Sequence, residues 1–489
     1  MHNQASAPHR RDRSKIGQHK TWTVILASLG VFMTALDTLV VTTSLPALRV
    51  DLHSSLSNLE WTVNAYNLAF ACLLLTGAAL GDRFGRRRMF TLGIGLFTAA
   101  SAAAALSPNV GALIAARAVQ GAGAAIVFPL TLTLISEAFP VEKRGAAIGL
   151  WGGITGLAVA AGPVVGGAVV TGISWHWIFW LNVPIGIALI PLAAARLSES
   201  FGPSGQLDIA GLALAGAGSL GVTWGLVRAS SIGWGSAEVV GALLAGIALI
   251  GAFLSWERHS DQPMLRIELF RQRTFAGANA VSFFMYAGLF GALFLMSQFL
   301  QTCLGYSPLE AGVRLLPWVL PPMFIAPIAG MLADRYGNRP FMALGMTLQA
   351  IGLGWVALVA TPSVSYPELA AAFTIAGVGT SFCFPTVANA VMGSVPLGEA
   401  GVASGTNSML RELGGVFGVA VLASVFARHG VYASQRTFVD GFTQALWVAV
   451  AFSGLGAVAA LFTAAKPRAG REHEIAHEGA PEIALAEAA

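Results

Sequence analysis

The sequence predicts an all-α integral membrane protein with 14 spans, built from two related six-helix bundles plus two extra transmembrane helices. Three observations predict this fold class. The 489 residues are 55% hydrophobic and only 11% charged, whereas soluble proteins carry about 25% charged residues. The apolar residues fall into runs of about 20, the length that a helix needs to cross a bilayer. A turn containing Asp, Arg and Gly occurs twice, at 81–88 and 333–339, which indicates two related halves.

Apolar runs between charged or turn-rich breaks define the expected spans. Helices must form them, because backbone polar groups need internal partners in hydrocarbon. The runs cover 21–45, 60–80, 89–107, 110–136, 146–170, 177–195, 208–228, 238–256, 275–300, 311–331, 341–361, 367–393, 403–426 and 442–464. The first run is longer than the apolar stretch of a cleaved signal peptide, about 7–15 residues, so we expect it to be retained.

Basic residues are distributed unequally between the two sides of these spans. If the N-terminus is cytoplasmic, 21 of the 28 Lys and Arg residues lie in inner segments. This asymmetry predicts an even number of spans in the inner or plasma membrane of the cell, with both termini cytoplasmic. Because the basic residues are dispersed among short loops rather than gathered in one patch, we expect no nucleic-acid partner.

The domain order follows from the spans. Residues 1–20 form a cytoplasmic tail, 21–197 the first bundle, 198–274 the two additional helices with their loops, and 275–464 the second bundle. Residues 465–489 are mostly polar, and we expect a disordered cytoplasmic tail there. The two Asp-Arg turns follow the second and tenth spans, and these positions are equivalent only if spans seven and eight are extra.

Charged residues inside the predicted spans are functional candidates, because each costs on the order of 3 kcal/mol to insert. Asp37 lies in the first span. Burial and a nearby cation change the proton affinity of a carboxyl in opposite directions, so a conformational change can make Asp37 bind or release a proton. We interpret Asp37 as a proton or cationic-substrate site. The alternative is a structural hydrogen bond to a neighbouring helix.

Three further charges lie within spans: Arg117 in the fourth, and Arg411 and Glu412 in the thirteenth. A guanidinium stays charged, so Arg117 either tunes a nearby carboxylate in proton coupling or anchors a buried hydrogen-bond network. Arg411 and Glu412 point about 100° apart on a helix and need not pair with each other. Glu412 is a second candidate for protonation, with packing against polar neighbours as the alternative.

The two repeated turns are interpreted as a conformational latch. An Asp at a helix end beside Arg residues can form ion pairs and helix-terminus contacts that hold two bundles in one state. The alternative role, setting topology by positive charge, does not explain why Asp and Gly recur at fixed offsets. The predicted latch residues are Asp82, Arg83, Gly85 and Arg86 in the first turn, and Asp334, Arg335, Gly337 and Arg339 in the second.

Small, polar and aromatic side chains within spans complete the set of candidates. Gly162, Pro163, Gly166 and Gly167 in the fifth span are typical of a close-packed helix face that can bend. A polar substrate cavity could be lined by Asn64, Tyr66, Asn67, Gln298, Asn389 and Asn407, with aromatic walls from Phe128, Trp151, Phe382 and Phe384. For each of these cavity residues taken singly, ordinary helix packing is the favoured alternative.

No residue pattern indicates an enzyme or a bound cofactor. His176 and the histidines near the C-terminus lack partners at metal-ligand spacing, so we expect no metal. The chain has no phosphate-binding loop of the GxxxxGK[ST] kind, which argues against a pump driven by ATP.

Several of these motifs resemble the major facilitator superfamily, in particular its 14-spanner drug:proton antiporters (the EmrB/QacA-like family). The resemblance runs from about residue 21 to 464. Residues 330–339 resemble the superfamily's loop motif in full, whereas the first copy has Ala78 at the opening glycine. Residues 113–125 resemble the fourth-helix motif, and 162–167 the fifth-helix antiporter motif, with Ala158 where a glycine is usual.

Other phrases match with departures. Residues 36–46 resemble the first-helix motif with Asp37 in place, although Leu39 and Thr42 replace a threonine and an asparagine. Residues 175–179 resemble an outer-loop phrase with His176 for arginine. Residues 410–415 resemble a thirteenth-helix phrase in which Glu412 replaces a glutamine.

The resemblance implies a major facilitator fold and proton-coupled efflux of a small amphipathic drug, antiseptic or secondary metabolite by alternating access. It makes Arg117 the proton-coupling arginine. The expected partners are the small-molecule substrate, protons and the lipid bilayer, with an accessory periplasmic or outer-membrane efflux partner as an option for a Gram-negative host. The alternatives are a proton-coupled nutrient importer on the same fold and a non-transporting membrane scaffold or sensor.

Overall fold

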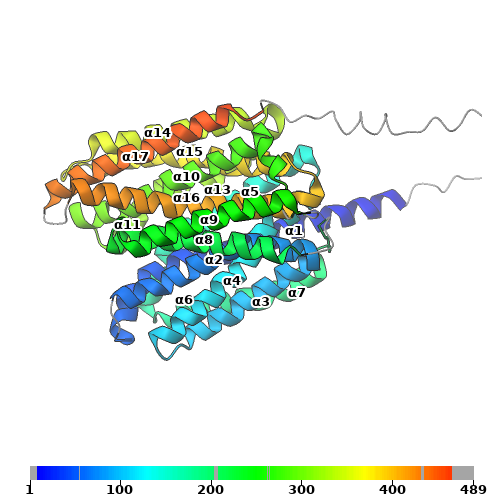
Figure 1. Cartoon of the computed structure of the whole chain (residues 1–489), viewed down its shortest axis with the longest axis horizontal. Coiled ribbons are helices and arrows are strands. Elements are labelled where there is room, and N and C mark those ends of the chain that lie inside the picture. Colours follow the sequence, from blue (N-terminus) through cyan, green and yellow to red (C-terminus); the bar gives the residue numbers. More distant parts are fainter. Residues whose placement is uncertain are drawn as a thin grey trace, which may run out of the picture.

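The computed structural model describes residues 8–53, 56–202, 207–260, 263, 265–430 and 434–464. Within them every element of regular secondary structure is a helix (Figure 1). The first bundle contains α1 (Pro8–Asp51), α2 (Leu56–Phe84), α3 (Arg86–Ala105), α4 (Val110–Ala138), α5 (Val141–Gly172), α6 (His176–Trp180) and α7 (Asn182–Arg196). Next come α8 (Ile209–Ile232), α9 (Ala237–His259) and the 3-10 helix η1 (Ile267–Arg271).

The second bundle begins with α10 (Arg273–Gln298), which continues into a π-helical turn, η2 (Phe299–Cys303). It then contains α11 (Pro308–Arg314), α12 (Leu316–Val319), α13 (Pro321–Tyr336), α14 (Asn338–Val359), α15 (Tyr366–Gly393), the 3-10 helix η3 (Leu397–Glu399), α16 (Ala400–His429) and α17 (Gln435–Leu461). The predicted tail 465–489 and residues 1–7 lie outside the described part of the chain.

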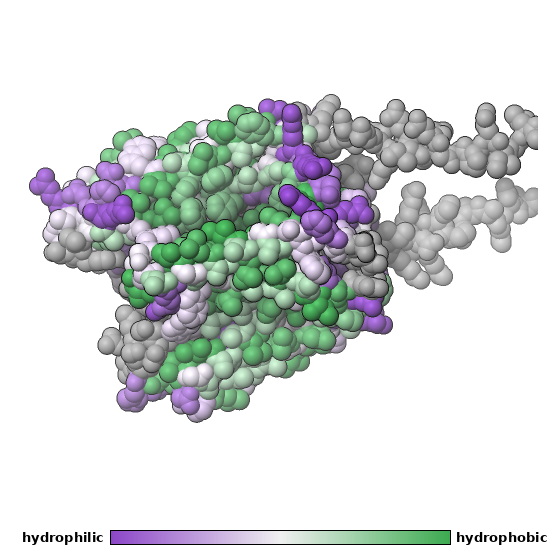
Figure 2. All heavy atoms as spheres, viewed as in Figure 1, coloured by the Kyte–Doolittle hydropathy of each residue, from purple (hydrophilic) through white to green (hydrophobic). Residues whose placement is uncertain are grey.

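Thirteen helical segments in the described ranges are long and apolar enough to cross a membrane. They lie at 13 of the 14 predicted spans. The remaining span, 146–170, lies within α5, a continuous helix of 32 residues. Apolar side chains form a band across the middle of the molecule, and polar ones gather at its two ends (Figure 2). The protein is therefore an all-helical, multi-pass membrane protein.

Two predicted spans are interrupted. The span 311–331 consists of α11, α12 and α13, because Pro317 and Pro321 lack the backbone N–H that would continue the helix. The span 177–195 consists of α6 and α7, which meet at Leu181. The first helix is longer than the predicted span, since α1 begins at Pro8 and ends at Asp51.

The two additional helices lie on the outside of the bundles. The helix α8 packs against α9 and contacts α2 and α16, one helix from each bundle. Side chains of α9 such as Leu244 and Ile247 are exposed, as expected for a helix that faces lipid. The start of α1 and the end of α17 lie at the same end of the molecule (Figure 1).

The bundles meet along two seams, α5 with α13 and α2 with α16. The α5–α13 seam depends on small residues. A Cβ at Gly149 would lie 2.8 Å from the Cα of Pro327, and one at Gly156 would lie 2.8 Å from the Cβ of Pro322. Glycine at these positions allows the two backbones to approach closely.

Candidate functional site

Asp37 and Arg117 form a buried ion pair inside the first bundle. Asp37 extends from α1 and Arg117 from α4, and the guanidinium donates to the Oδ2 of the carboxylate. Asp37 is 2% exposed and Arg117 is fully buried. Removing one partner of such a pair leaves an uncompensated buried charge and costs about 3–5 kcal/mol. Two of the three residues predicted for proton coupling, Asp37 and Arg117, are therefore direct partners.

The second carboxylate oxygen of Asp37 has two amide donors. The Nδ2 of Asn182 donates to Oδ1 at 2.9 Å, and the Nε2 of Gln120 donates to it at 2.8 Å. Both amides also contact the Oγ of Ser101, at 3.1 Å and 3.3 Å. Asp37 thus accepts from α4 twice and from α7 once, which fixes the carboxylate among three helices. Sequence reasoning missed Gln120 and Asn182, although Gln120 lies within the fourth-helix motif.

Arg117 is held by further contacts. Its Nε donates to the carbonyl of Thr62 at 3.0 Å, and its NH1 donates to the Oε1 of Gln120 at 2.7 Å. The guanidinium carbon lies 4.2 Å from the centre of the Tyr66 ring. The remaining terminal nitrogen of Arg117 and the Oδ1 of Asn182 have no hydrogen-bond partner among the described residues. The site therefore has one free donor and one free acceptor to offer if Asp37 changes its protonation state.

A second buried cation, Arg411, lies where the bundles meet. Its guanidinium carbon is 4.8 Å from the ring centres of Phe128 and Tyr286 and 6.0 Å from that of Trp151. Phe128 and Trp151 belong to the first bundle, and Tyr286 to the second. Arg411 is 4% exposed, and its Nε has no hydrogen-bond partner in the described ranges. Such an arrangement suits a planar ligand that accepts hydrogen bonds.

A run of ring contacts connects Arg117 to Arg411. Arg117 lies over Tyr66, whose ring is 6.0 Å from that of Phe70. The Phe70 ring is 5.6 Å from the ring of Phe128, and Phe128 contacts Arg411. Side chains of α2 and α4 therefore link the ion pair in the first bundle to the boundary between the bundles.

The structure places the other predicted polar residues in different surroundings. Glu412 is half-buried next to Arg411, and the two form no ion pair within the described ranges. Asn407 donates to Asn279 at 3.0 Å and to Ser282 at 2.7 Å, inside the second bundle. Asn64, Asn67 and Gln298 are half-buried, on α2 and at the end of α10.

The aromatic residues that were predicted to form cavity walls have two kinds of surroundings. Phe128 and Trp151 contact Arg411, and Phe384 packs on Tyr286. Phe382 instead stacks on Phe341.

The first predicted latch turn contacts the opposite bundle. Arg86 is fully buried and donates to Asp82 at 2.8 Å and to Glu137. It also donates to the carbonyl of Gly398, just before α16, at 3.1 Å. Asp82 in turn accepts the backbone N–H of Val402 in the first turns of α16. The turn after α2 is thus attached to the start of a helix in the second bundle.

The second latch turn repeats this arrangement from the other side. Asp334 accepts the backbone N–H groups of Gly145 at 3.0 Å and of Ala146 at 3.2 Å, in the first turns of α5. Asn389 donates to Asp334 at 3.4 Å and to Asn338 at 3.1 Å. This residue, predicted to line the cavity, therefore lies with the latch. Each bundle contributes one carboxylate that accepts from the N-terminal part of a helix in the other.

Glycines in both turns and in both partner helices make the contacts possible. Gly85 and Gly337 have φ values of +104° and +88°, a conformation that other residues rarely adopt. A Cβ at Gly145 would collide with the carboxylate of Asp334, and one at Gly401 with that of Asp82. Gly145 and Gly401 were not predicted, yet both occur near the start of the span that the opposite turn contacts.

The remaining predicted latch and packing residues differ in their contacts. Arg83 and Arg335 are exposed, and Arg339 is half-buried beside Arg273. Gly162 and Gly166 are buried in α5, and a Cβ at Gly167 would have an ordinary contact, 3.7 Å from Leu309. Pro163 lies within α5, and its side chain is outside the described part of the chain.

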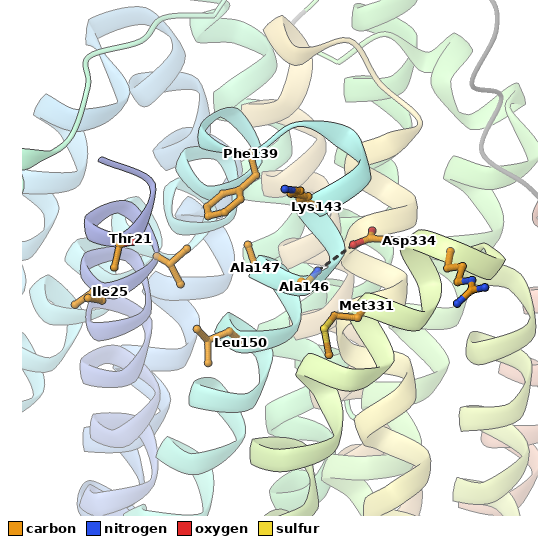
Figure 3. A pocket seen from close by; sticks show the side chains of 11 residues that line it. Thr21, Ile25, Phe139, Lys143, Ala146, Ala147, Leu150, Met331 and Asp334 are labelled. Atoms are coloured by element: carbon orange, nitrogen blue, oxygen red, sulfur yellow. Dashed lines mark hydrogen bonds between the residues drawn. The ribbon is translucent and has the colours of Figure 1, made fainter. Parts of the chain in front are cut away.

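Beside the second latch, a groove of about 690 Å³ opens between α1, α5 and α13 (Figure 3). Its lining is mainly apolar, with Lys143, Asp334 and Arg335 as the charged members. In the described ranges, no group of three or more His, Cys, Asp or Glu residues could hold a metal ion.

Comparison with known proteins identifies relatives over most of the chain. The profile of the Major Facilitator Superfamily matches residues 27–256 and 278–487. The tetracenomycin C resistance and export protein of Streptomyces glaucescens is 33% identical over 412 residues, covering 83% of this chain and 76% of that protein. The multidrug resistance protein Stp of Mycobacterium tuberculosis is 34% identical, covering 83% of this chain and 75% of the relative.

A third relative is the methylenomycin A resistance protein of Bacillus subtilis, which is 33% identical and covers 81% of this chain and 86% of its own length. Among solved structures, the human organic anion transporter MFSD10 has the same fold, with a TM-score of 0.65 at 17% identity. That match covers 91% of this chain and 99% of the solved one.

Proposed function

The chain belongs to the major facilitator superfamily, and from this premise we propose that it exports a small amphipathic compound in exchange for protons. The relatives named for drug or antibiotic resistance and export cover more than four fifths of the chain. Efflux of a drug, an antiseptic or a secondary metabolite is the activity that these similarities support. Transport requires no covalent chemistry, and no residue is assigned an enzymatic role.

The observation that carries the proton-coupling part is the buried pair of Asp37 and Arg117. A proton that reaches Asp37 neutralises the carboxylate, so the ion pair with Arg117 is lost while the amides of Gln120 and Asn182 stay in place. Arg117 then still donates to Thr62 and Gln120, but it lacks the acceptor that the Asp37 carboxylate had supplied. Because this rearrangement changes the charge balance of the bundle core, protonation and conformation become linked.

We place substrate binding at Arg411 and the aromatic rings that surround it. These rings come from both bundles, so a ligand between them would contact two bodies that move relative to each other. The contacts from Arg117 through Tyr66, Phe70 and Phe128 to Arg411 supply a physical connection between proton and substrate sites. Glu412 is proposed as a secondary protonation site next to Arg411. Asn64, Asn67 and Gln298 remain candidates for the cavity lining.

The proposed topology has 14 spans with both termini cytoplasmic, in the cell membrane. Residues 21–197 and 275–464 form the moving bundles, and 198–274 supply the two additional helices. In this orientation the two latch turns lie at the cytoplasmic face, where their contacts keep the bundles together while the opposite face is open. Breaking both sets of contacts is the proposed step that opens the cytoplasmic face.

The experiment is a substrate panel in proteoliposomes with an imposed pH gradient. Efflux is expected to depend on the proton gradient and to persist without ATP. The substitution Asp37→Asn leaves Arg117 charged without its partner, so it should lower the free energy of unfolding, and it should abolish gradient-driven flux in the folded protein. Uptake that follows the inward proton gradient would instead identify an importer, and absence of flux with every compound would favour a scaffold or sensor. Unchanged proton-driven flux in Asp37→Asn would refute the assignment of Asp37.

A further inference from the structure

The groove between α1, α5 and α13 combines an apolar wall with a basic rim (Figure 3). Val24, Ile25, Phe139, Leu150 and Met331 form the apolar part. Of these, Ile25, Leu150 and Met331 are 42%, 44% and 52% exposed. In a membrane protein such side chains face lipid, and the concave surface offers one lipid a defined place to lie.

The cations at the rim have no ion-pair partner among the described residues. Lys143 and Arg335 are exposed, and neither forms an ion pair within the described ranges. A third cation, Lys20, lies 5.8 Å from the centre of the Phe139 ring, so its ammonium group is also close to the groove. Asp334, the acidic lining residue in the described part of the chain, accepts from the backbone N–H groups of Gly145 and Ala146. Among the described residues, the rim of the groove therefore has more cations than carboxylates, above an apolar wall.

We propose that this groove binds an anionic phospholipid, with its phosphate between Lys143 and Arg335 and an acyl chain along Leu150 and Met331. The inference rests on the proposed orientation, which puts this end of the molecule in the cytoplasmic leaflet. Basic pockets between transmembrane helices on that side suit anionic head groups. A free phosphate would satisfy the cations but would leave the apolar wall uncovered, so the lipid accounts for both halves of the groove.

The position of the groove gives the bound lipid a mechanical role. Lys143 belongs to the first bundle and Arg335 to the second, and both lie next to the contact between Asp334 and α5. A phosphate held by both cations bridges the bundles at that contact. Separation of α5 from α13 would pull the two cations apart, so the lipid favours the arrangement in which the latch is closed.

Native mass spectrometry of the purified full chain tests lipid binding without any need for transport. Three probes are compared: phosphatidylglycerol, phosphatidylcholine with the same acyl chains, and inorganic phosphate as a competitor. The charge variant is Lys143→Gln with Arg335→Gln. Its matched control is Arg258→Gln with Arg271→Gln, which removes two exposed arginines from the same proposed side of the membrane. The variant Leu150→Trp fills the apolar wall without changing charge.

Phosphatidylglycerol should bind the wild type more tightly than phosphatidylcholine does. The Lys143/Arg335 variant should lose about thirty-fold in apparent affinity, because each cation near the surface contributes about a factor of five. The Arg258/Arg271 control should bind as the wild type does, and Leu150→Trp should bind weakly. Equal binding of the two lipids, or equal loss in both charge variants, would overturn the proposal. Displacement of the lipid by inorganic phosphate together with normal binding to Leu150→Trp would overturn it in favour of a simple anion site.

Discussion

The carboxylate of Asp334 accepts the backbone N–H of Gly145 at 3.0 Å across the boundary between the two bundles. Asp82 does the same in the opposite direction, toward Val402 at the start of α16. Each carboxylate meets a helix at a glycine, since a Cβ at Gly145 or Gly401 would occupy the space of the carboxylate. The two bundles are therefore joined by reciprocal contacts of one kind.

These contacts predict that Gly145→Ala weakens the closed latch. The added methyl group would displace Asp334 and also meet the backbone of Gly330. Cysteines introduced next to the latch should become more reactive toward a water-soluble thiol reagent, and the rate of efflux should fall. Gly241→Ala is the matched control, because open space surrounds Gly241 in α9. Equal reactivity in the two variants would contradict the role of Gly145.

Replacement of Asp37 by asparagine should remove proton coupling, although the side chain keeps nearly the same size and shape. Flux driven by a pH gradient is expected to disappear, whereas exchange of substrate down its own gradient can persist. Asp51→Asn makes the same chemical change on the same helix, at a residue that accepts from the Trp175 indole at 2.7 Å. That variant should retain gradient-driven flux. A comparable loss there would mean that removing any negative charge from α1 impairs transport, and that Asp37 has no special role.

Asn182→Ala should destabilise the protein as well as impair coupling. The substitution removes the amide that donates to both Asp37 and Ser101, and the loss of a buried donor to a charged group costs about 1.5–3 kcal/mol. Thermal unfolding in detergent should show the lower stability. Asn182→Asp adds a carboxylate beside Asp37 and should be worse than Asn182→Ala. The reverse order would argue against the amide's role as a donor.

Arg411→Gln should reduce substrate affinity more than it reduces the maximal rate. A charged hydrogen bond to a ligand contributes about 1.5–3 kcal/mol, so KM is expected to rise by about ten- to one-hundred-fold. Arg428→Gln, an exposed position near the other end of the same helix, serves as the control. Quenching of tryptophan fluorescence by a transported compound gives a second readout, because Trp151 lies beside Arg411. An unchanged KM would remove Arg411 from the substrate site.

Phe70→Leu should weaken the link between proton and substrate sites. The leucine keeps the apolar volume approximately but breaks the ring contacts with Tyr66 and Phe128. Binding of substrate, measured by fluorescence, should stay close to that of the wild type, while the number of protons exchanged per substrate should fall. Phe299→Leu, which removes a stacked ring from the second bundle, is the control. Intact stoichiometry in Phe70→Leu would exclude this route.

The sequence predicted individual residues better than their partners. Asp37 and Arg117 were both candidates because a charge in hydrocarbon is costly wherever it occurs along a helix. Gln120 and Asn182 could not be found in this way, since uncharged amides are tolerated in spans and only the rotation of each helix decides which face meets Asp37. The same reason explains Asn389, whose polarity indicated a cavity but whose side chain lies against Asp334.

The repeated turns show a similar limit. The Asp-Gly pattern predicted a latch, and the positive φ of Gly85 and Gly337 explains the invariant spacing of glycine within the two copies. The pattern could not reveal that Arg86 is buried while Arg83 and Arg335 are exposed, because all three arginines occur within four residues of an aspartate. Helix interruptions at Pro317 and Pro321 were likewise hidden, since hydropathy does not register a missing backbone N–H.

The reciprocal contacts of Asp82 and Asp334 can be separated at a small cost in free energy. Across the boundary between the bundles, Asp82 and Asp334 accept from backbone amides at helix beginnings, and in the proposed orientation these amides face the cytoplasm when the bundles part. Water molecules then accept hydrogen bonds from the amides and donate hydrogen bonds to the carboxylates. Because every lost hydrogen bond is replaced, these contacts contribute only a small net free energy to the difference between the two states. In the proposed function, the proton gradient then needs to supply little free energy to separate these contacts.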